Sequence, residues 1–211
     1  MPATGAVTLP RPRAGTDTAP SVVHLTTVDP TLALGLSREL EMDVAAGFET
    51  VGMSAPGPYG QELATIGVRH IALAALTRRW DPRADVRAAL QLRGELRALQ
   101  PQVLHTHTPK AGVWGGSSAG RPGIPIVVNT CHGLWAQPDD RRRKRWPVYA
   151  AEAAAGLFSD YELYQNGQDC DTLTFAGRRA RAEVVGNGID LRRFGFDPVG
   201  RARVRAELGV R

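Results

Sequence analysis

The chain has 211 residues, of which 43% are hydrophobic and 22% charged, and its formal net charge is +5. This composition lies in the ordinary globular range, so most of the chain is expected to bury a core. A membrane-spanning helix needs about 18 consecutive apolar residues, and the sequence contains no such run. It also shows no apolar segment of the kind that a secretory signal requires. The two cysteines, Cys131 and Cys170, provide no disulfide framework and suit a reducing compartment, so we expect a cytoplasmic protein.

Residues 1–20 are rich in Pro, Ala, Thr and Gly, which predicts a disordered leader. Beyond them, short β-branched runs alternate with segments of helical period. In chain order we predict a strand at 22–25, helix 31–46, strand 48–53, helix 59–66, strand 68–73, a helix from 81–82 that ends at Pro101, a strand from 103, a helix from 109, strand 124–128, helix 141–155, strand 157–164, a helix from 166 or 167 to 175 and strand 183–185. This alternation predicts an α/β fold, a doubly wound parallel sheet forming a single Rossmann-like domain.

The helix after Asp81 and Pro82 carries the clearest local signals. Asp81 is a good N-cap and Pro82 suits the first turn, while Pro101 ends the helix. Its predicted buried face consists of Val86, Leu90, Leu96 and Leu99.

Ligands of doubly wound sheets bind outside the carboxyl ends of the strands, and two loops there are rich in polar residues. Residues 105–110 read His-Thr-His-Thr-Pro-Lys where a strand meets a helix, and a helix start with an added lysine favours an anion. We therefore expect His107 and Lys110 to bind a phosphate or carboxylate, and His105 to be a half-buried strand histidine. His132, beside Gly133, has a pKa range suited to hydrogen bonding and proton transfer near neutrality.

A metal site is an alternative for these histidines. His105, His107 and His132, with Cys131 adjacent, offer nitrogen and sulfur atoms that zinc accepts. The sequence near them has no acidic residue to complete a hydrolase site. We therefore expect no metal, and a metal-dependent hydrolase is the third of three functional alternatives.

A basic run at 141–145 precedes Trp146 and Tyr149. Cationic and aromatic residues together are typical of a membrane interface, so Arg142, Arg143, Lys144, Arg145 and Trp146 are the predicted membrane-facing residues. A solvated helix whose aromatic residues pack on the sheet is the equal alternative. Pro147 is expected to bend or restart this helix. Nucleic acid is not an expected partner, because no recognition motif accompanies the charge.

Seven runs of the sequence resemble, in order and spacing, the N-terminal domain of family 4 glycosyltransferases. They are His-Leu-Thr-Thr-Val-Asp at 24–29, Ser-Ala-Pro-Gly-Pro at 54–58, Leu-Thr-Arg at 76–78, the run from Val103 to Gly112, Asn-Thr-Cys-His-Gly at 129–133, Gln-Asn-Gly-Gln-Asp at 165–169 and Val-Gly-Asn-Gly-Ile-Asp at 185–190. The similarity extends from about 22 to 194 and is closest to the bacterial branch that builds capsule, exopolysaccharide or lipid-linked oligosaccharide. One departure is the loop at 26–30, which reads Thr-Thr-Val-Asp-Pro where many relatives have glycines.

The resemblance implies a GT-B fold, in which an N-terminal domain shapes the acceptor site and a C-terminal domain binds the nucleotide-sugar without a metal or other cofactor. It implies a catalytic role for His132, which matches the histidine that relatives present to the reacting sugar. Thr27, His107 and Lys110 match the acceptor-side rim, and Gly133 and Asn187 complete the implied substrate-binding set.

The resemblance also implies a domain division. Residues 21–194 would form the acceptor-side domain, and 195–211 a linker at the start of a donor-binding domain that the chain lacks. The expected activity is hexosyl transfer from a nucleotide-sugar to a lipid-linked or polysaccharide acceptor, incomplete for this chain alone, on the inner face of the plasma membrane. The alternative is a non-catalytic acceptor-binding or scaffolding module.

Overall fold

The computed structural model describes residues 19–79, 81–119, 123–137, 139–174, 181–188 and 194–210. The predicted leader therefore lies almost wholly outside the described residues. Seven strands form one parallel sheet in the order β3-β2-β1-β4-β5-β6-β7. Their bounds are β1 Ser21–Val28, β2 Glu49–Ala55, β3 Arg69–Ala72, β4 Val103–Thr106, β5 Ile126–Cys131, β6 Tyr161–Tyr164 and β7 Arg181–Val184. The predicted doubly wound, Rossmann-like sheet is confirmed.

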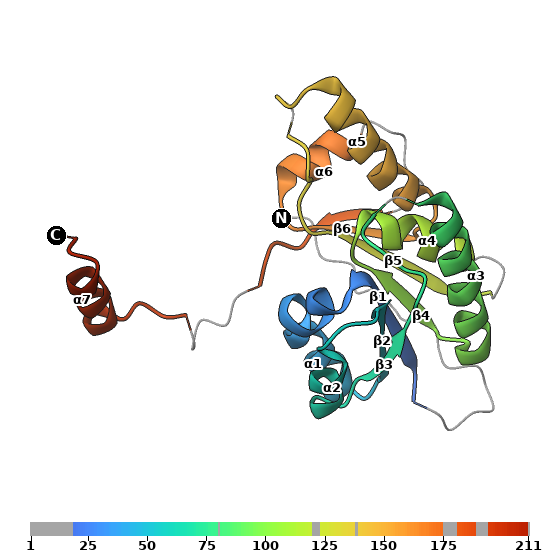
Figure 1. Cartoon of the computed structure of the whole chain (residues 1–211), viewed down its shortest axis with the longest axis horizontal. Coiled ribbons are helices and arrows are strands. Elements are labelled where there is room, and N and C mark those ends of the chain that lie inside the picture. Colours follow the sequence, from blue (N-terminus) through green and yellow to red (C-terminus); the bar gives the residue numbers. More distant parts are fainter. Residues whose placement is uncertain are drawn as a thin grey trace.

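Helical segments connect successive strands. Those of the first half are η1 Thr31–Gly35, α1 Ser37–Ala45, α2 Gly60–Thr65 and α3 Pro82–Leu99; the second half has α4 Pro109–Ala119, α5 Arg142–Leu157, α6 Gly167–Thr174 and α7 Pro198–Glu207. Helices α1 and α2 cover one face of the sheet, and α3, α4, α5 and α6 cover the other (Figure 1). Helix α7 lies apart from the sheet and has no buried residue.

Each face of the sheet has its own apolar core, because successive strand side chains point to opposite faces. Val23, Leu25, Val51 and Met53 pack with Leu92 of α3 and with α4. On the opposite face, a smaller core joins η1, α1 and α2 through Leu32, Leu36, Leu40, Leu63 and Val68.

Helix α4 lies unusually close to its neighbours. A Cβ at Gly115 would fall 2.8 Å from side-chain carbons of Leu25 and Thr106, and one at Gly116 would fall 2.5 Å from Cβ of Phe158. The small residues of this helix therefore permit close packing on the sheet and on the end of α5.

The structure corrects three local expectations. The predicted helix 31–46 is divided, because η1 has π-helical geometry, closed by a bond from Leu36 N to Thr31 O, and α1 begins afresh at Ser37. Helix α5 runs through Pro147 as one element, so the restart that was one of the two alternatives for Pro147 does not occur.

The third correction concerns the buried face of α3. Val86 and Leu90 are more than half exposed, and the buried residues are Ala84, Asp85, Ala88, Leu92 and Leu96. That face contains small residues and a buried acid, so the largest apolar side chains do not identify it. The N-cap at Asp81 is confirmed, since its side chain accepts from the backbone N–H groups of Arg83 and Ala84.

Candidate functional site

Four histidines meet at the carboxyl ends of the three central strands. Strand register pairs His24 of β1 with His105 of β4. His107 comes directly after β4, two residues beyond His105, and shares the face of His105, so their ring centroids are 4.0 Å apart. His132 follows β5, with its ring centroid 5.3 Å from that of His107.

Three of these rings form a line of hydrogen bonds that starts on α1. The Asp43 carboxylate lies 2.7 Å from Nε2 of His24, and Nδ1 of His24 lies 2.9 Å from Nε2 of His107. Nδ1 of His107 then lies 3.0 Å from Nε2 of His132. Because His24 and His107 are buried and His132 is exposed, the line joins α1 to the solvent-facing edge of the sheet.

Beyond His132 the line continues into the loops that follow β6 and β7. The Gln165 amide nitrogen lies 2.8 Å from Nδ1 of His132 and donates to Oδ1 of Asn187, at 3.3 Å. Gly133, next to His132, has a φ of 115°, a backbone conformation that side chains rarely adopt. His107, His132, Gly133 and Asn187, predicted as one site, are therefore brought together by the structure.

The donor and acceptor roles along the line depend on the tautomers, and the partners at its two ends are consistent with one set of them. A carboxylate such as Asp43 only accepts, so His24 donates from Nε2 and accepts at Nδ1. The same reasoning gives His107 and His132 their protons on Nε2, and the Gln165 amide donates to the free Nδ1 of His132. Each ring in this state is neutral.

Burial favours these neutral forms. Burial lowers the pKa of His107 well below its usual 6.5, and the neighbouring His105, His24 and His132 lower it further. Partial burial also lowers the pKa of His132, although Glu39 opposes this shift. At neutral pH the exposed end of the line is thus an uncharged imidazole that can polarise or orient a hydroxyl.

His105 stands beside this line with its own partners. Its Nδ1 lies 3.1 Å from a carboxylate oxygen of Glu39, and its Nε2 lies 2.7 Å from the Thr130 hydroxyl. Burial lowers the pKa of His105, partly offset by the bond to Glu39. For Glu39, burial raises the pKa but the His105 bond and nearby histidines outweigh it, so its pKa is lowered. An ionised Glu39 therefore accepts from a neutral His105.

Thr27 lies at the same edge of the sheet. Its hydroxyl is 2.7 Å from that of Thr108, which caps the start of α4, and it is largely buried. The adjacent Asp29 carboxylate accepts from the backbone N–H of Tyr59 and leaves no room for a side chain at Gly57. These contacts fasten the loop after β1 to the loop after β2.

Lys110 is not part of this arrangement. Its ammonium is buried and pairs with the buried Asp85 carboxylate at 2.5 Å, and it donates to the carbonyls of Thr77 and Arg79. The contacts of Lys110 join α4 to α3 on the other face of the sheet. The structure therefore separates Lys110 from His107, with which it was expected to act.

The basic start of α5 is a separate exposed surface. Arg142, Arg143 and Lys144 are exposed, and Trp146 is 51% exposed. Lys144 lies over the ring of Trp135, which is 78% exposed, at 5.8 Å, while Tyr149 is buried in the core. One aromatic residue of this helix therefore packs inward and one faces solvent, and the membrane-facing role of the basic run stays a prediction. None of the helices in the described part of the chain combines the length and apolar character needed to cross a membrane.

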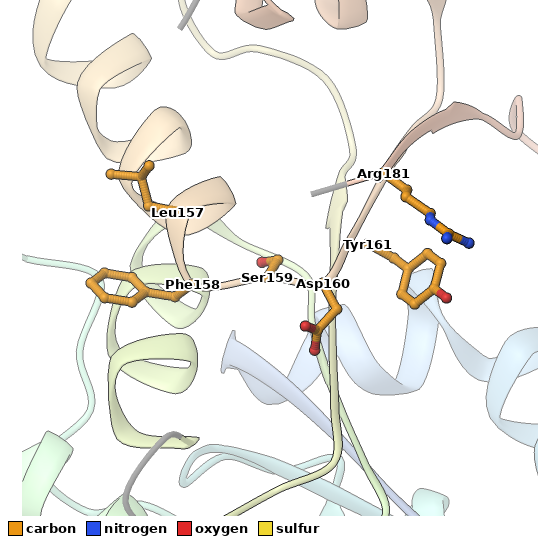
Figure 2. Close-up of a pocket in the computed structure, with 6 residues that line it drawn as sticks. All are labelled: Leu157, Phe158, Ser159, Asp160, Tyr161 and Arg181. Carbon is orange, nitrogen blue, oxygen red and sulfur yellow. The ribbon is translucent and has the colours of Figure 1, made fainter. Parts of the chain in front are cut away.

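A hollow lies at the opposite edge of the sheet, at the amino ends of β6 and β7 (Figure 2). It is lined by Leu157, Phe158, Ser159, Asp160, Tyr161 and Arg181. The Asp160 carboxylate accepts from the backbone N–H of Val127, so this acid has a structural partner. Doubly wound sheets bind ligands at their carboxyl edge, so the histidine line is the stronger candidate site.

Four residues of this site were not predicted from the sequence: His24, Glu39, Asp43 and Gln165. The predicted metal alternative grouped His105 with Cys131 and His132, whereas burial raises the pKa of the Cys131 thiol to about 12 and its sulfur faces Glu152. The strand order 3-2-1-4 would have placed His24 beside His105, and the four-residue spacing of Glu39 and Asp43 would have placed both on one face of α1.

Solved structures share this fold. Sucrose-phosphate synthase from Thermosynechococcus elongatus has a TM-score of 0.69 and 18% identity, covering 91% of this chain and 53% of its own. HepE from Anabaena, in complex with UDP and glucose, has a TM-score of 0.64 and 15% identity, covering 89% of this chain and 50% of its own. The chain therefore spans about half the length of these GT-B glycosyltransferases.

Sequence similarity points the same way. The UDP-Gal:alpha-D-GlcNAc-diphosphoundecaprenol alpha-1,3-galactosyltransferase of Escherichia coli is 25% identical over 115 residues, which are 52% of this chain and 29% of that enzyme. The sequence profile of Glycosyltransferase Family 4 matches residues 30–193, which include His107, His132 and Asn187. The chain belongs to glycosyltransferase family 4.

Proposed function

We propose that this chain is the acceptor-side part of a glycosyltransferase that transfers a hexose from a nucleotide-sugar to a hydroxyl of a lipid-linked or polysaccharide acceptor. The observation that supports the proposal most is the line from Asp43 through His24 and His107 to the exposed His132. It holds a neutral imidazole at the sheet edge where such folds bind ligands. Family membership makes sugar transfer the chemistry for which this imidazole is suited.

In this proposal His132 orients and polarises the reacting groups. Positioning of the acceptor hydroxyl and stabilisation of the leaving phosphate supply most of the acceleration in such reactions. Gln165 and Asn187 hold one side of the His132 ring, and Gly133 lets a substrate approach the backbone. The nucleotide-sugar is a substrate, and we propose that transfer itself requires no metal or other cofactor.

We further propose that the donor is bound by a second unit. The chain spans about half of its structural relatives, and none of the residues discussed above forms a charged phosphate site. Lys110, the strongest candidate for that role, is committed to Asp85. We therefore expect this chain alone to transfer sugar very slowly, whether its donor-binding unit is a separate chain or the remainder of a longer protein.

A lipid-linked acceptor is favoured by two observations. The Escherichia coli relative acts, by its name, on a diphosphoundecaprenol-linked sugar. The exposed basic start of α5, with Trp135 and Trp146, matches the chemistry of an anionic membrane surface. We propose peripheral attachment to the inner face of the plasma membrane through Arg142, Arg143, Lys144, Arg145 and Trp146.

Reconstitution tests the activity. The purified chain would be incubated with membranes and a panel of nucleotide-sugars, with and without a donor-binding domain from a relative, and glycosylated product measured by mass spectrometry. Product only with the added domain supports the proposal in full. Product from the chain alone shows that it holds its own donor site. No product under any condition contradicts the proposal, provided that the relative's complete enzyme is active in the same assay.

Liposome co-sedimentation tests the membrane contact independently. Neutralising Arg142, Arg143, Lys144 and Arg145 should release the chain from anionic vesicles, and raising the salt concentration should do the same. The matched control neutralises Arg201, Arg203 and Arg205 of α7, an equally exposed basic helix. Equal loss of binding in both variants would show general charge attraction instead of a membrane-facing α5.

A scaffolding module is the second candidate, and one observation favours it. Val184 and Val185, at the end of β7, are 48% and 52% exposed, which leaves apolar surface at the last strand. Such surface fits a protein partner. A chain that binds saccharide acceptors, yet yields no product with any donor-binding domain, would establish this alternative.

A further inference from the structure

Three buried imidazoles and one carboxylate converge between α1 and the carboxyl ends of β1 and β4. One nitrogen or oxygen from each of His24, Glu39, His105 and His107 lies within 4.8 Å of the others. Glu39 Oε1 is 3.1 Å from Nδ1 of His105 and 4.0 Å from Nδ1 of His24, which is 2.9 Å from Nε2 of His107. In a tetrahedral zinc site, metal–ligand bonds of about 2.0–2.2 Å separate the ligand atoms by roughly 3.3 Å. The four atoms therefore need to move only slightly to surround one ion.

We propose that His24, Glu39, His105 and His107 form a binding site for a divalent transition metal of the zinc class. Imidazole nitrogen with one carboxylate oxygen is a donor set that suits Zn²⁺. The four ligands fill a tetrahedral shell, and a closed shell indicates a structural ion, not one that activates water. The site shares His24 and His107 with the hydrogen-bonded line described above, but it does not use His132, and its filled shell leaves no open position for substrate.

The surroundings of the three imidazoles match those of metal ligands. In such sites the ring nitrogen that does not bind the metal donates to an outer partner, which fixes the orientation of the ring. Nε2 of His24 has the Asp43 carboxylate at 2.7 Å, and Nε2 of His105 has the Thr130 hydroxyl at 2.7 Å. Nδ1 of His107 has Nε2 of His132 at 3.0 Å. Each ring thus has one nitrogen for the ion and a partner on the other.

Position and access also fit a structural ion. His24 and His107 are almost fully buried, whereas the Glu39 side chain is 39% exposed on α1. An ion can therefore enter along the side of α1. Once bound, it would join α1 to β1 and β4 next to the divided segment η1–α1.

Metal binding would have a consequence outside its own ligands. His107 would ligate through Nε2 and carry its proton on Nδ1, so His132 would accept at Nε2 and carry its proton on Nδ1. In the metal-free state the bond between His107 and His132 runs in the opposite direction, so metal binding also requires the Gln165 amide to turn its oxygen toward Nδ1 of His132. The tautomer of His132, which is not a ligand, therefore reports on the ion without any measurement of activity.

Metal titration of the full chain tests the proposal. After dialysis against EDTA, Zn²⁺ binding would be measured by calorimetry, and Co²⁺ binding by its visible absorption. We expect one ion per chain, a Co²⁺ spectrum without the thiolate charge-transfer band that Cys131 or Cys170 would produce, and a Zn²⁺-dependent change of the His132 tautomer in nitrogen NMR.

Variants on the surface of α1 keep the test independent of folding. Asp43→Asn removes an outer partner and should weaken binding about 10- to 100-fold, and Glu39→Gln, which removes a ligand, should weaken it more. His70→Gln, the matched control, changes a histidine that belongs neither to the proposed metal site nor to the hydrogen-bonded line, and this variant should bind as the unaltered chain does. The proposal is overturned by the lack of a one-to-one complex, by equal affinity in all three variants, or by a thiolate band.

Discussion

The side chains of the run from His105 to Lys110 lie on both faces of the sheet. Those at its start belong to a line of hydrogen bonds, and the one at its end forms a buried ion pair. His105 and His107 face α1, where they join the line of hydrogen bonds that ends at the exposed His132. Lys110, on the first turn of α4, faces α3 and pairs with Asp85. One edge of a parallel sheet thus carries a polar cluster that reaches solvent and, a few residues later, a buried ion pair that holds two helices together.

The difference between these two clusters shows how burial alone misleads. Both contain buried ionisable side chains at the carboxyl end of β4. The histidine cluster has half-exposed acids at one end and an exposed imidazole at the other. The Lys110–Asp85 pair has both charges inside the protein. A polar cluster that reaches solvent is available to a ligand, whereas a closed pair serves packing.

The largest expected effect on stability concerns the closed pair. Replacing Lys110 by Met keeps the stem of the side chain but leaves Asp85 as an uncompensated buried charge, which should lower the free energy of unfolding by about 3–5 kcal/mol. Urea denaturation measures this change. Lys144→Met is the matched control, because Lys144 is the only other lysine and its pair with Asp140 is exposed.

A second substitution, at Asp85, tests whether the loss of stability in Lys110→Met comes from the unpaired buried charge. Asp85→Leu in the Lys110→Met background should recover much of the lost stability, because no charge then stays buried alone. If Lys110→Met folds with unchanged stability and loses sugar transfer, Lys110 is a binding residue and the division between the two faces is wrong.

The next largest effect concerns the exposed end of the histidine line. His132→Ala should reduce the rate of sugar transfer in the reconstituted system by about 10²- to 10³-fold, the usual result of removing one group that stabilises the transition state. Stability should change little, since His132 is exposed. Rates and urea midpoints measured on the same preparation separate the two effects. A drop in stability as large as that of Lys110→Met would make His132 a structural residue.

Much of the fold followed from local signals. Asp81 with Pro82 marks the start of α3, and the β-branched runs locate the strands, because backbone preferences act within a few residues. The division of the helix at 31–46 did not follow, since the break at Leu36 arises where η1 and α1 pack together against α2 and the sheet. Sequence period alone does not contain that tertiary contact.

The site was predicted in part for the same reason. His107 and His132 lie in loops that the topology rule selects, and Asn187 was predicted from the family resemblance. His24, Glu39 and Asp43 lie in a strand and a helix, and they join the site only through the pairing of β1 with β4. The Lys110 side chain points toward α3 because it pairs with Asp85. The hydrophobic pattern of α3 does not predict that Asp85 lies on its buried face.

A smaller effect on stability tests the close packing of α4 against the end of α5. Gly116→Ala would place a Cβ 2.5 Å from Cβ of Phe158, and such overpacking should cost about 1–3 kcal/mol of stability. Gly94→Ala in α3 is the matched control, because no atom lies within 4 Å of its added Cβ. There the substitution should stabilise the protein by about 0.5–1 kcal/mol, since alanine favours a helix. Denaturation midpoints that move in the same direction for both variants would contradict the close packing of α4.

The smallest effect is the dependence of the free energy of unfolding on pH. It should distinguish the histidine cluster from the Lys110–Asp85 pair. Burial lowers the pKa of His105 and His107 in the folded chain below the usual 6.5, so at mildly acidic pH the unfolded state binds more protons. The free energy of unfolding of the metal-free chain should therefore fall as the pH decreases from about 7.5 to about 5. The lowered pKa of Glu39 acts in a lower window, because its stabilising charge is lost only below its usual 4.5. His107→Gln should flatten this pH dependence, whereas Lys110→Met should shift the whole curve downward with its slope unchanged. Because His105 is unchanged in His107→Gln, part of the slope should persist; a slope equal to that of the unaltered chain would mean that the protons enter elsewhere, and the histidine cluster would then lose its distinction from the closed pair.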